Sequence, residues 1–305
     1  MSNRTVYSVA GFRVASELPL PELLQHDEDG PVDIEIRLAR ITDELAASVK
    51  AMPEARVIPT AVRLDIPQIG RFLVRNGREI TVDPEPRTPP ADVRGFLLGS
   101  ALGAVWLQRG LFPLHASAIV IDGAAIAFAG EQGAGKSTMA AWMVKQGCRL
   151  LCDDVCVIRF PENTDQVHPM VYPLYPRVKL WRDALDALEI DAKELQRDVH
   201  RVDKFHLPAK QSFLADPVPL RHIDFLAFRP EDSEPRIEDI SPARAVPLLR
   251  DNTYRFQYVS GLELTREHFL HCIRLANSVP GHFLQRPRRH SMLAACQRLV
   301  EEQLR

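Results

Sequence analysis

The sequence predicts an α/β fold in which a smaller β-rich domain, residues 1–105, precedes an α/β domain, residues 106–305. In the first hundred residues, apolar and charged side chains alternate with period two, which is typical of half-buried strands. From Leu114 onward the pattern becomes strand, turn, strand, loop, helix and strand, the order of a helical crossover between neighbouring strands. A length of 305 residues leaves room for two domains.

The composition limits the class of protein. The chain is 46% hydrophobic with a formal charge of −2. It shows neither an apolar stretch long enough to span a bilayer nor a basic and then apolar leader at its start. Nucleic-acid binding usually requires a clear basic excess, which is missing. We therefore expect a cytoplasmic protein that has no membrane or nucleic-acid partner.

The elements of the first domain follow from local patterns. The segment "VDIEIRL" at 32–38 alternates as a strand, and "RFLVRNGREITVD" at 71–83 contains two such runs joined at Asn76-Gly77. Both turn residues tolerate positive φ, so a hairpin is predicted there. Apolar residues then recur at helical spacing through 89–110, and Gly110 supplies the stop. The domain boundary is placed at this helix.

The second domain opens with two strands joined at Asp122-Gly123, followed by a loop and a helix that ends at Gly147. The next segment, "RLLCDDVCVI" at 149–158, reads as one buried strand. Cys152 and Cys156 do not have the spacing of a zinc finger or ribbon, so we interpret them as small core residues.

After Phe160 the chain is proline-rich and irregular up to about residue 178. The remaining patterns predict helices and strands in alternation, with Thr265 as a candidate N-cap. The predicted elements are a short helix at 182–190, strands at 222–229 and 280–285, and helices at 265–277 and 290–304.

A glycine-rich loop, "GEQGAGKS" at 130–137, lies between a predicted strand and a predicted helix and fits the pattern G-x-x-x-x-G-K-S. Its glycines let backbone N–H groups face a phosphate, and the helix N-terminus adds positive potential. Lys136 would reach the β- and γ-phosphates of ATP, and the Ser137 hydroxyl would bind Mg²⁺. A glycine-rich turn without a ligand is the alternative. The expected nucleotide contacts are Gly130, Glu131, Gln132, Gly133, Ala134, Gly135, Lys136, Ser137 and Thr138.

Two adjacent carboxylates, Asp153 and Asp154, follow on the next predicted strand. Neighbouring strand residues point to opposite faces, so one could hold a metal ion while the other accepts a hydroxyl proton. Alternatively, one of them caps a loop. His115 begins the strand that precedes the loop-bearing strand, and a lone histidine in such a place is often structural.

The segment at 114–158, "LHASAIVIDGAAIAFAGEQGAGKSTMAAWMVKQGCRLLCDDVCVI", resembles the catalytic core of the bacterial HPr kinase/phosphorylase family. The resemblance implies a P-loop kinase domain of HPr-kinase type that uses ATP and Mg²⁺. It implies that His115, Lys136 and Asp154 are active-site residues, with Asp154 as the proton acceptor. By the same likeness, Ser137 binds the metal, and Asp153 supports the metal and orients its neighbour.

The N-terminal half, from "SELPLPEL" to "GREITVDP", resembles a divergent HPr-kinase-like group that includes kinases of lasso peptide precursors. This likeness implies a serine kinase acting on a peptide or small protein, most simply a lasso-type precursor peptide. A homo-oligomer is a further implication, because members of the family form rings. The family's glycine-rich segment with a metal-serving glutamate is replaced here by "YPLYPRVKLWRDAL" at 172–185.

A transferred phosphoryl group favours cations in addition to Lys136. Arg177, Lys179 and Lys204 are the candidates for this catalytic role, and solvated surface charge is the alternative for each. The basic run "RPRRH" at 286–290 is interpreted as a basic surface loop, and the alternative is a contact for an acidic peptide or another subunit. Two other functions stay open: an ATP-binding regulator or ATPase without a dedicated acceptor, and a kinase of HPr or of a small metabolite.

Overall fold

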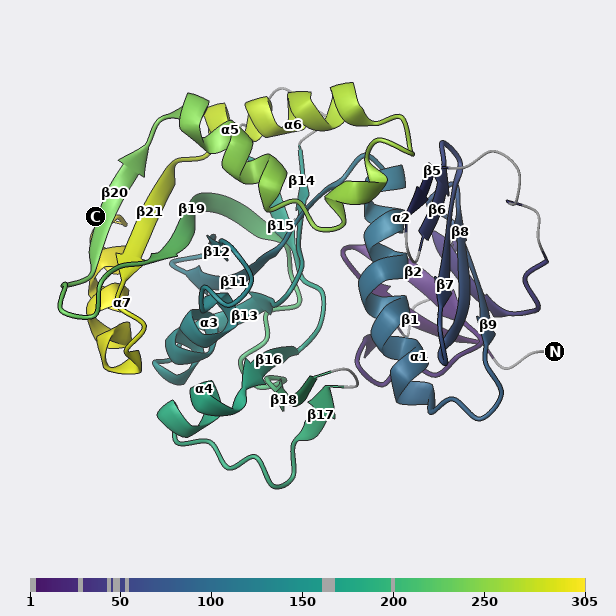
Figure 1. Cartoon of the computed structure of the whole chain (residues 1–305), viewed down its shortest axis with the longest axis horizontal. Helices are drawn as coiled ribbons and strands as arrows, with labels where there is room; N and C mark the ends of the chain where they lie inside the picture. The colour runs from purple at the N-terminus through teal and green to yellow at the C-terminus, as the bar shows by residue number, and fades with distance from the viewer. Residues whose placement is uncertain are drawn as a thin grey trace. The chain divides into compact units, whose positions relative to one another are not determined.

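A computed structural model describes residues 4–26, 30–42, 45, 50–52, 55–160, 168–198 and 201–304. The chain forms two compact units, coloured along the sequence in Figure 1: Met1–Pro113 with Tyr254–Leu270, and Leu114–Thr253 with His271–Arg305. The sequence placed the boundary between residues 105 and 106, whereas the structure divides the chain after Pro113 and returns it to the first unit for one segment.

The first unit contains a nine-stranded sheet in the order β3-β1-β2-β4-β9-β8-β7-β6-β5. The predicted hairpin at Asn76-Gly77 is confirmed, since φ is 52° and 62° at these residues and the Arg78 N–H donates to the Arg75 carbonyl oxygen at 3.0 Å. The strands are β1 (Thr5–Val9), β2 (Phe12–Ser16), β3 (Leu24–Gln25), β4 (Ile34–Leu38), β5 (Lys50–Met52), β6 (Ala55–Ile58), β7 (Ala61–Ile66), β8 (Gly70–Arg75) and β9 (Glu79–Pro84).

The predicted helix at 89–110 is present as a continuous helical run with a π-helical turn in its middle. It consists of α1 (Pro90–Phe96), η1 (Leu97–Ala101) and α2 (Leu102–Gln108). Trp106, near its end, is 1% exposed and stacks on Phe12 with 5.9 Å between ring centroids. This burial against the N-terminal sheet explains why residues 106–113 belong to the first unit.

The returning segment contains η2 (Phe256–Tyr258) and packs against glycines of this helical run. A Cβ atom built at Gly99 would lie 3.1 Å from the Tyr254 hydroxyl, and one built at Gly103 would lie 3.0 Å from its ring. The absence of side chains at these two positions therefore lets Tyr254 approach the helix closely. The sequence offered no local signal for this long-range packing.

The second unit has a main sheet in the order β14-β15-β19-β12-β11-β13, with β21 paired to β19 and β20 paired to β21. A separate small sheet has the order β16-β18-β17. The strands are β11 (Ala116–Ile121), β12 (Ala124–Ala129), β13 (Arg149–Cys152), β14 (Cys156–Arg159), β15 (Met170–Tyr172), β16 (Arg177–Trp181), β17 (Gln196–Asp198), β18 (Arg201–Pro208), β19 (Val218–Phe228), β20 (Arg236–Ile240) and β21 (Gly281–Arg286).

Two elements carry the chain between the units: β10 (Phe112–Leu114) and α6 (Thr265–Ser278). Helix α6 begins at Thr265 itself, whereas the sequence suggested Thr265 as the N-cap, the residue just before the helix. The other helices are α3 (Lys136–Lys145), α4 (Arg182–Ala187), α5 (Pro242–Asp251), η3 (His290–Met292) and α7 (Leu293–Glu302). In the described part of the chain, no helix is both long and apolar enough to cross a bilayer.

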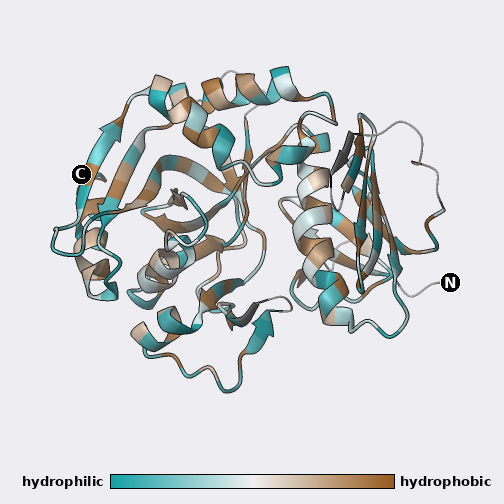
Figure 2. Ribbon diagram, in the orientation of Figure 1, coloured by the Kyte–Doolittle hydropathy of each residue, from teal (hydrophilic) through white to brown (hydrophobic). Residues whose placement is uncertain are grey.

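The centre of the main sheet is strongly apolar, as the brown ribbon of its strands in Figure 2 shows. Every residue of Ala125–Ala129 in β12 is 0% exposed. Strands β12, β19 and β21 are parallel neighbours, so their carboxyl ends lie at one edge of the sheet. Ligands of open α/β sheets bind outside this kind of edge.

Two sequence predictions in this sheet need correction. The helix α3 does not connect neighbouring strands, because β11 lies between β12 and β13 and pairs with both. The predicted single strand at 149–158 is broken between β13 and β14, where Asp154 has φ of 72°. The apolar run extended through the break because Val155 and both flanking strands are buried. Cys152 and Cys156 are fully buried free thiols, as expected of core residues.

Candidate active site

The glycine-rich loop follows β12 and ends where α3 begins at Lys136. Gly130, Gly133 and Gly135 have φ of 138°, 86° and 94°, a region that side chains disfavour. A Cβ atom at Gly130 would also lie 2.8 Å from the Leu226 carbonyl oxygen of β19. The loop is therefore held tightly against the sheet, with the N-terminus of a ten-residue helix behind it.

This packing predicts a clear stability difference between two glycine substitutions. Gly130→Ala is expected to lower the free energy of unfolding by about 2 kcal/mol or more, because backbone strain and a collision with Leu226 add together. Gly123→Ala is the matched control, since Gly123 also has positive φ but a Cβ there meets nothing within 4 Å. Thermal and denaturant unfolding compare the two, and equal losses would contradict the close approach of loop and sheet.

The side chain of Lys136 is buried, with 7% of the residue exposed, and points back toward the loop. Its Nζ donates to the carbonyl oxygens of Gly130 at 2.8 Å and Glu131 at 3.0 Å. Burial lowers the pKa of Lys136 to about 8, against the opposing influence of the charges of Asp154 and Asp153. Among the described residues, this ammonium forms no ion pair within 4 Å, so a phosphate would be its first direct anionic partner.

This pKa predicts how nucleotide affinity depends on pH. Below about pH 8 the free Lys136 is protonated, and above it binding an anionic phosphate must first recapture a proton. Affinity for ADP or ATP should therefore fall from about pH 8 upward, by at most tenfold per pH unit. Titrations from about pH 7.5 to about pH 9.5 avoid protonation of the phosphates themselves. A flat profile would remove Lys136 from the phosphate site, and Lys136→Arg should lose the pH dependence because arginine stays charged.

Asp153 is 4% exposed and both of its carboxylate oxygens accept hydrogen bonds. The Ser117 hydroxyl of β11 donates to Oδ1 at 2.6 Å, and the Lys179 N–H of β16 donates to Oδ2 at 2.7 Å. Asp153 thus joins the main sheet to the small sheet. Ser117 was not among the predicted site residues, because an alternating strand residue carries no signal of its own.

Asp154 lies beside it in a different environment, with 26% of its side chain exposed. The Lys179 Nζ donates to its Oδ2 at 2.9 Å. Burial by itself would raise the pKa of Asp154, but the charges of Lys179, His115 and Lys204 outweigh it and hold that pKa well below its ordinary value. Asp154 is therefore an ionised carboxylate throughout the physiological pH range.

His115 lies between β10 and β11 and contacts the same residue. Its Nδ1 is 2.8 Å from the Asp154 carbonyl oxygen, and since a carbonyl can only accept, Nδ1 carries the proton. Burial, assisted by the charge of Lys136, lowers the pKa of His115 despite the nearby carboxylates. Its backbone N–H donates to the Asn252 carbonyl oxygen at 2.7 Å, while the Asn252 side chain accepts from the Gly130 N–H at 2.9 Å. Asn252, which the sequence analysis missed, therefore links His115 to the loop.

The three predicted cations differ in position. Lys179 binds both aspartates directly, through its backbone and its side chain. Lys204 of β18 lies over the Trp181 ring at 5.8 Å, and its charge acts on Asp154 and Lys136. Arg177 instead has its Nη1 3.3 Å from His206 Nδ1 and stacks over Tyr175, so these contacts lie within and beside the small sheet rather than at the aspartates.

Arg286 is a further cation that the sequence analysis treated only as part of a basic loop. It is the last residue of β21, is 3% exposed, and approaches Gly135 so closely that a Cβ there would overlap its Nη2. Its Nη1 donates to the Pro287 carbonyl oxygen at 3.0 Å, and its buried Nε has no hydrogen-bond partner. Within the described ranges it forms no ion pair. A buried, unpaired guanidinium beside a glycine-rich loop is a favourable place for an anion.

The remaining loop residues divide by exposure. Glu131, Gln132 and Gly133 are exposed, whereas Ala134 and Thr138 are buried in the fold. Ser137 is partly exposed, and its hydroxyl makes no hydrogen bond with any residue that the structure describes. It is thus available to an incoming ligand.

Comparisons with known proteins find a likeness in structure but no match in sequence. No family model matches the chain, and no curated protein matches it. Among solved structures, the HPr(Ser) kinase/phosphatase from Coxiella burnetii is similar over 63% of this chain and 95% of that chain, at 13% identity and a TM-score of 0.34.

Proposed function

We propose that the chain is an ATP-dependent kinase that transfers the γ-phosphoryl group to a serine hydroxyl of a peptide or small protein. The observation that carries this proposal is the state and place of Asp154. It is an ionised, partly exposed carboxylate, and its negative charge raises the pKa of Lys136 in the glycine-rich loop. A site that only binds nucleotide needs the loop but no carboxylate poised to accept a proton.

The triphosphate would lie along the loop at 130–138, where backbone N–H groups and the N-terminus of α3 favour negative charge. Lys136 would exchange its two carbonyl partners for phosphate oxygens, which is favourable because a charge-assisted bond replaces neutral acceptors. Arg286 would add a second cation from the carboxyl end of β21. Two cations on one phosphate chain stabilise the charge that shifts during transfer.

The residues present also fit a magnesium ion. The partly exposed Ser137 hydroxyl is available as a hard oxygen ligand, and Asp153 would hold the ion directly or through water. When bound, Mg²⁺ neutralises phosphate charge and orients the oxygens of the nucleotide. Because both oxygens of Asp153 already accept hydrogen bonds, its carboxylate is fixed in orientation before any ligand arrives.

In the transfer step, the serine oxygen attacks the γ-phosphorus in line while the bond from that phosphorus to the β-phosphate oxygen breaks. Asp154 accepts the hydroxyl proton, and the products are phosphoserine and ADP. The low pKa of Asp154 makes it a weak base, so it orients the hydroxyl early and takes the proton late in the step. His115 and Lys179 hold Asp154 in place through its carbonyl oxygen and its Oδ2.

The test uses ATP labelled at the γ-phosphate, magnesium and the purified full chain. Candidate acceptors are added one at a time: a serine-containing lasso-type precursor peptide, HPr and free serine. Label that appears on a serine of one acceptor supports the proposal and identifies the class of substrate. Label released only as free phosphate, at a rate that no acceptor changes, would overturn it in favour of an ATPase or ATP-binding regulator.

A further inference from the structure

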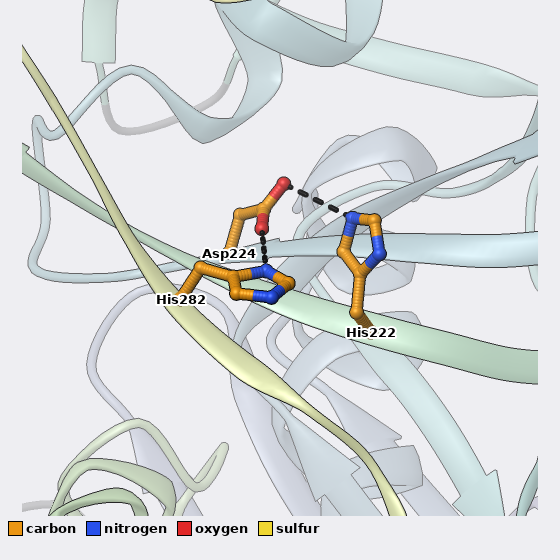
Figure 3. A group of neighbouring side chains, drawn as sticks. All are labelled: His222, Asp224 and His282. Carbon is orange, nitrogen blue, oxygen red and sulfur yellow. Dashed lines mark hydrogen bonds and ion pairs between the residues drawn. The ribbon is translucent and has the colours of Figure 1, made fainter. Parts of the chain in front are cut away.

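A second group of ionisable side chains is carried by two neighbouring strands of the main sheet. It is buried and takes no part in the chemistry above. Figure 3 shows His222 and Asp224 on β19 facing His282 on β21. Two residues apart on one strand, His222 and Asp224 share a face of the sheet, and the register places His282 directly beside Asp224. Their exposed fractions are 2%, 0% and 6%.

The contacts of this group are incomplete. His282 Nδ1 is 3.0 Å from Asp224 Oδ1, which is a normal hydrogen-bond distance. His222 Nε2 is 3.4 Å from Asp224 Oδ2, yet neither of these two buried atoms has a hydrogen-bond partner. Buried polar atoms without a partner are destabilising and rare in folded proteins, so two such atoms facing each other indicate a ligand between them.

We propose that His222, Asp224 and His282 bind a divalent transition-metal ion, zinc in the first instance. Their three ligand atoms all lie within 4.8 Å of one another. Two ligands at about 2.1 Å from a tetrahedral zinc ion are separated by about 3.4 Å, close to the spacing of the two unpartnered atoms. Two imidazoles and one carboxylate favour zinc over magnesium, which prefers oxygen ligands alone.

The surroundings of His282 support coordination through Nδ1. Its other ring nitrogen, Nε2, lies 3.8 Å from Asp239 Oδ1, and Asp239 is the register partner of His282 on β20. A histidine that binds metal usually presents its other N–H to a carboxylate; Asp239 lies on that side of the ring, at a distance longer than a hydrogen bond. In the described part of the chain no further His, Cys, Asp or Glu joins the three, so water would be the fourth ligand.

The position of the ion assigns it a structural role. It would cross-link β19 and β21, the strands that carry Leu226 against Gly130 and Arg286 against Gly135. The competing arrangement is a buried Asp224 bound by two histidine N–H groups with no metal. The two differ in metal content, which can be measured without reference to any kinase activity.

The experiment uses untagged full-length protein purified without chelator. Elemental analysis after dialysis against metal-free buffer should find about one zinc per chain, and the chelator-treated protein should bind zinc again in calorimetric titration. His282→Gln and Asp224→Asn should each weaken that binding at least tenfold. His206→Gln is the matched control, because His206 is likewise bonded to an aspartate, Asp198, but lies outside the proposed site, so this variant should retain the metal.

If these variants fail to fold, cobalt substitution of the unaltered chain decides the question. Co²⁺ held by nitrogen and oxygen ligands gives ligand-field absorption without the thiolate charge-transfer band that a cysteine site would show. Absence of metal from the purified protein together with no zinc binding by the chelator-treated chain would overturn the proposal. Equal zinc binding by all variants, or a thiolate band, would do the same.

Discussion

Asp154→Asn is expected to lower the rate of phosphoryl transfer by about 10²- to 10⁴-fold while leaving nucleotide affinity within a few-fold of the original. The amide keeps the size of the side chain but cannot accept the serine proton. The loop, Lys136 and Arg286 are unchanged, so the phosphate contacts persist. Single-turnover transfer from labelled ATP measures the first quantity, and calorimetric titration with ADP measures the second.

Two controls separate this loss from a general effect on the fold. Asp183→Asn changes an exposed aspartate in the first turn of α4 and should leave both quantities unaltered. Circular dichroism of Asp154→Asn should match the original chain. Its thermal unfolding should come at a lower temperature, because Lys179 loses its ionic partner, but above the temperature of the assay. If Asp154→Asn transfers phosphate at the original rate, Asp154 is not the proton acceptor.

Lys136→Ala should weaken nucleotide binding and abolish measurable transfer together. A charge-assisted hydrogen bond contributes about 1.5–3 kcal/mol, which corresponds to about 10- to 100-fold in affinity. The effect on transfer is expected to be larger, because the same cation also stabilises charge that develops as the γ-phosphoryl group moves. Fluorescent-nucleotide titration and the labelled-ATP assay measure the two losses.

The matched control for Lys136→Ala is Lys145→Ala, at the opposite end of the same helix. Lys145 is the last residue of α3 and lies at the end of the helix opposite the loop. Its Nζ donates to the Leu188 carbonyl oxygen at 2.7 Å. Its loss removes the same charge from α3 without touching the phosphate site. Equal loss of nucleotide affinity in both variants would show that helix charge in general, and not a contact at the loop, sustains binding.

Much of the local structure could be predicted because its causes lie within a few residues. Asn76-Gly77 and Asp122-Gly123 adopt positive φ and turn their hairpins, as the chemistry of these residues requires. The strand, loop and helix around Gly130 follow from glycine spacing and from apolar runs. An apolar run does not reveal the end of a strand when the residues of the following irregular segment are also buried. For this reason the sequence did not predict the break at Asp154.

In the candidate site, likewise, the residue types could be predicted from local motifs but not all of their contacts. His115, Lys136, Asp153 and Asp154 were proposed from motif order. In the structure, hydrogen bonds connect His115, Asp153 and Asp154 with one another or with Lys179, whereas Lys136 bonds to the loop and interacts with the two aspartates through its charge alone. The contacts of Lys179 could not be distinguished from those of Arg177 beforehand, although the two residues are only two positions apart on β16. Which of them meets the aspartates depends on how the small sheet packs, and no local pattern encodes that.

By itself, then, the sequence determined the α/β class, the hairpins, the position of the glycine-rich loop and the residue types available for phosphate chemistry, because each depends on near neighbours along the chain. Tertiary structure alone decided that Asn252 joins His115 to the loop, that Arg286 reaches Gly135, and that His282 meets His222 and Asp224. These meetings depend on strand register and on chain reversals over tens of residues. Register is set by the packing of the whole sheet, which is a property of the folded molecule.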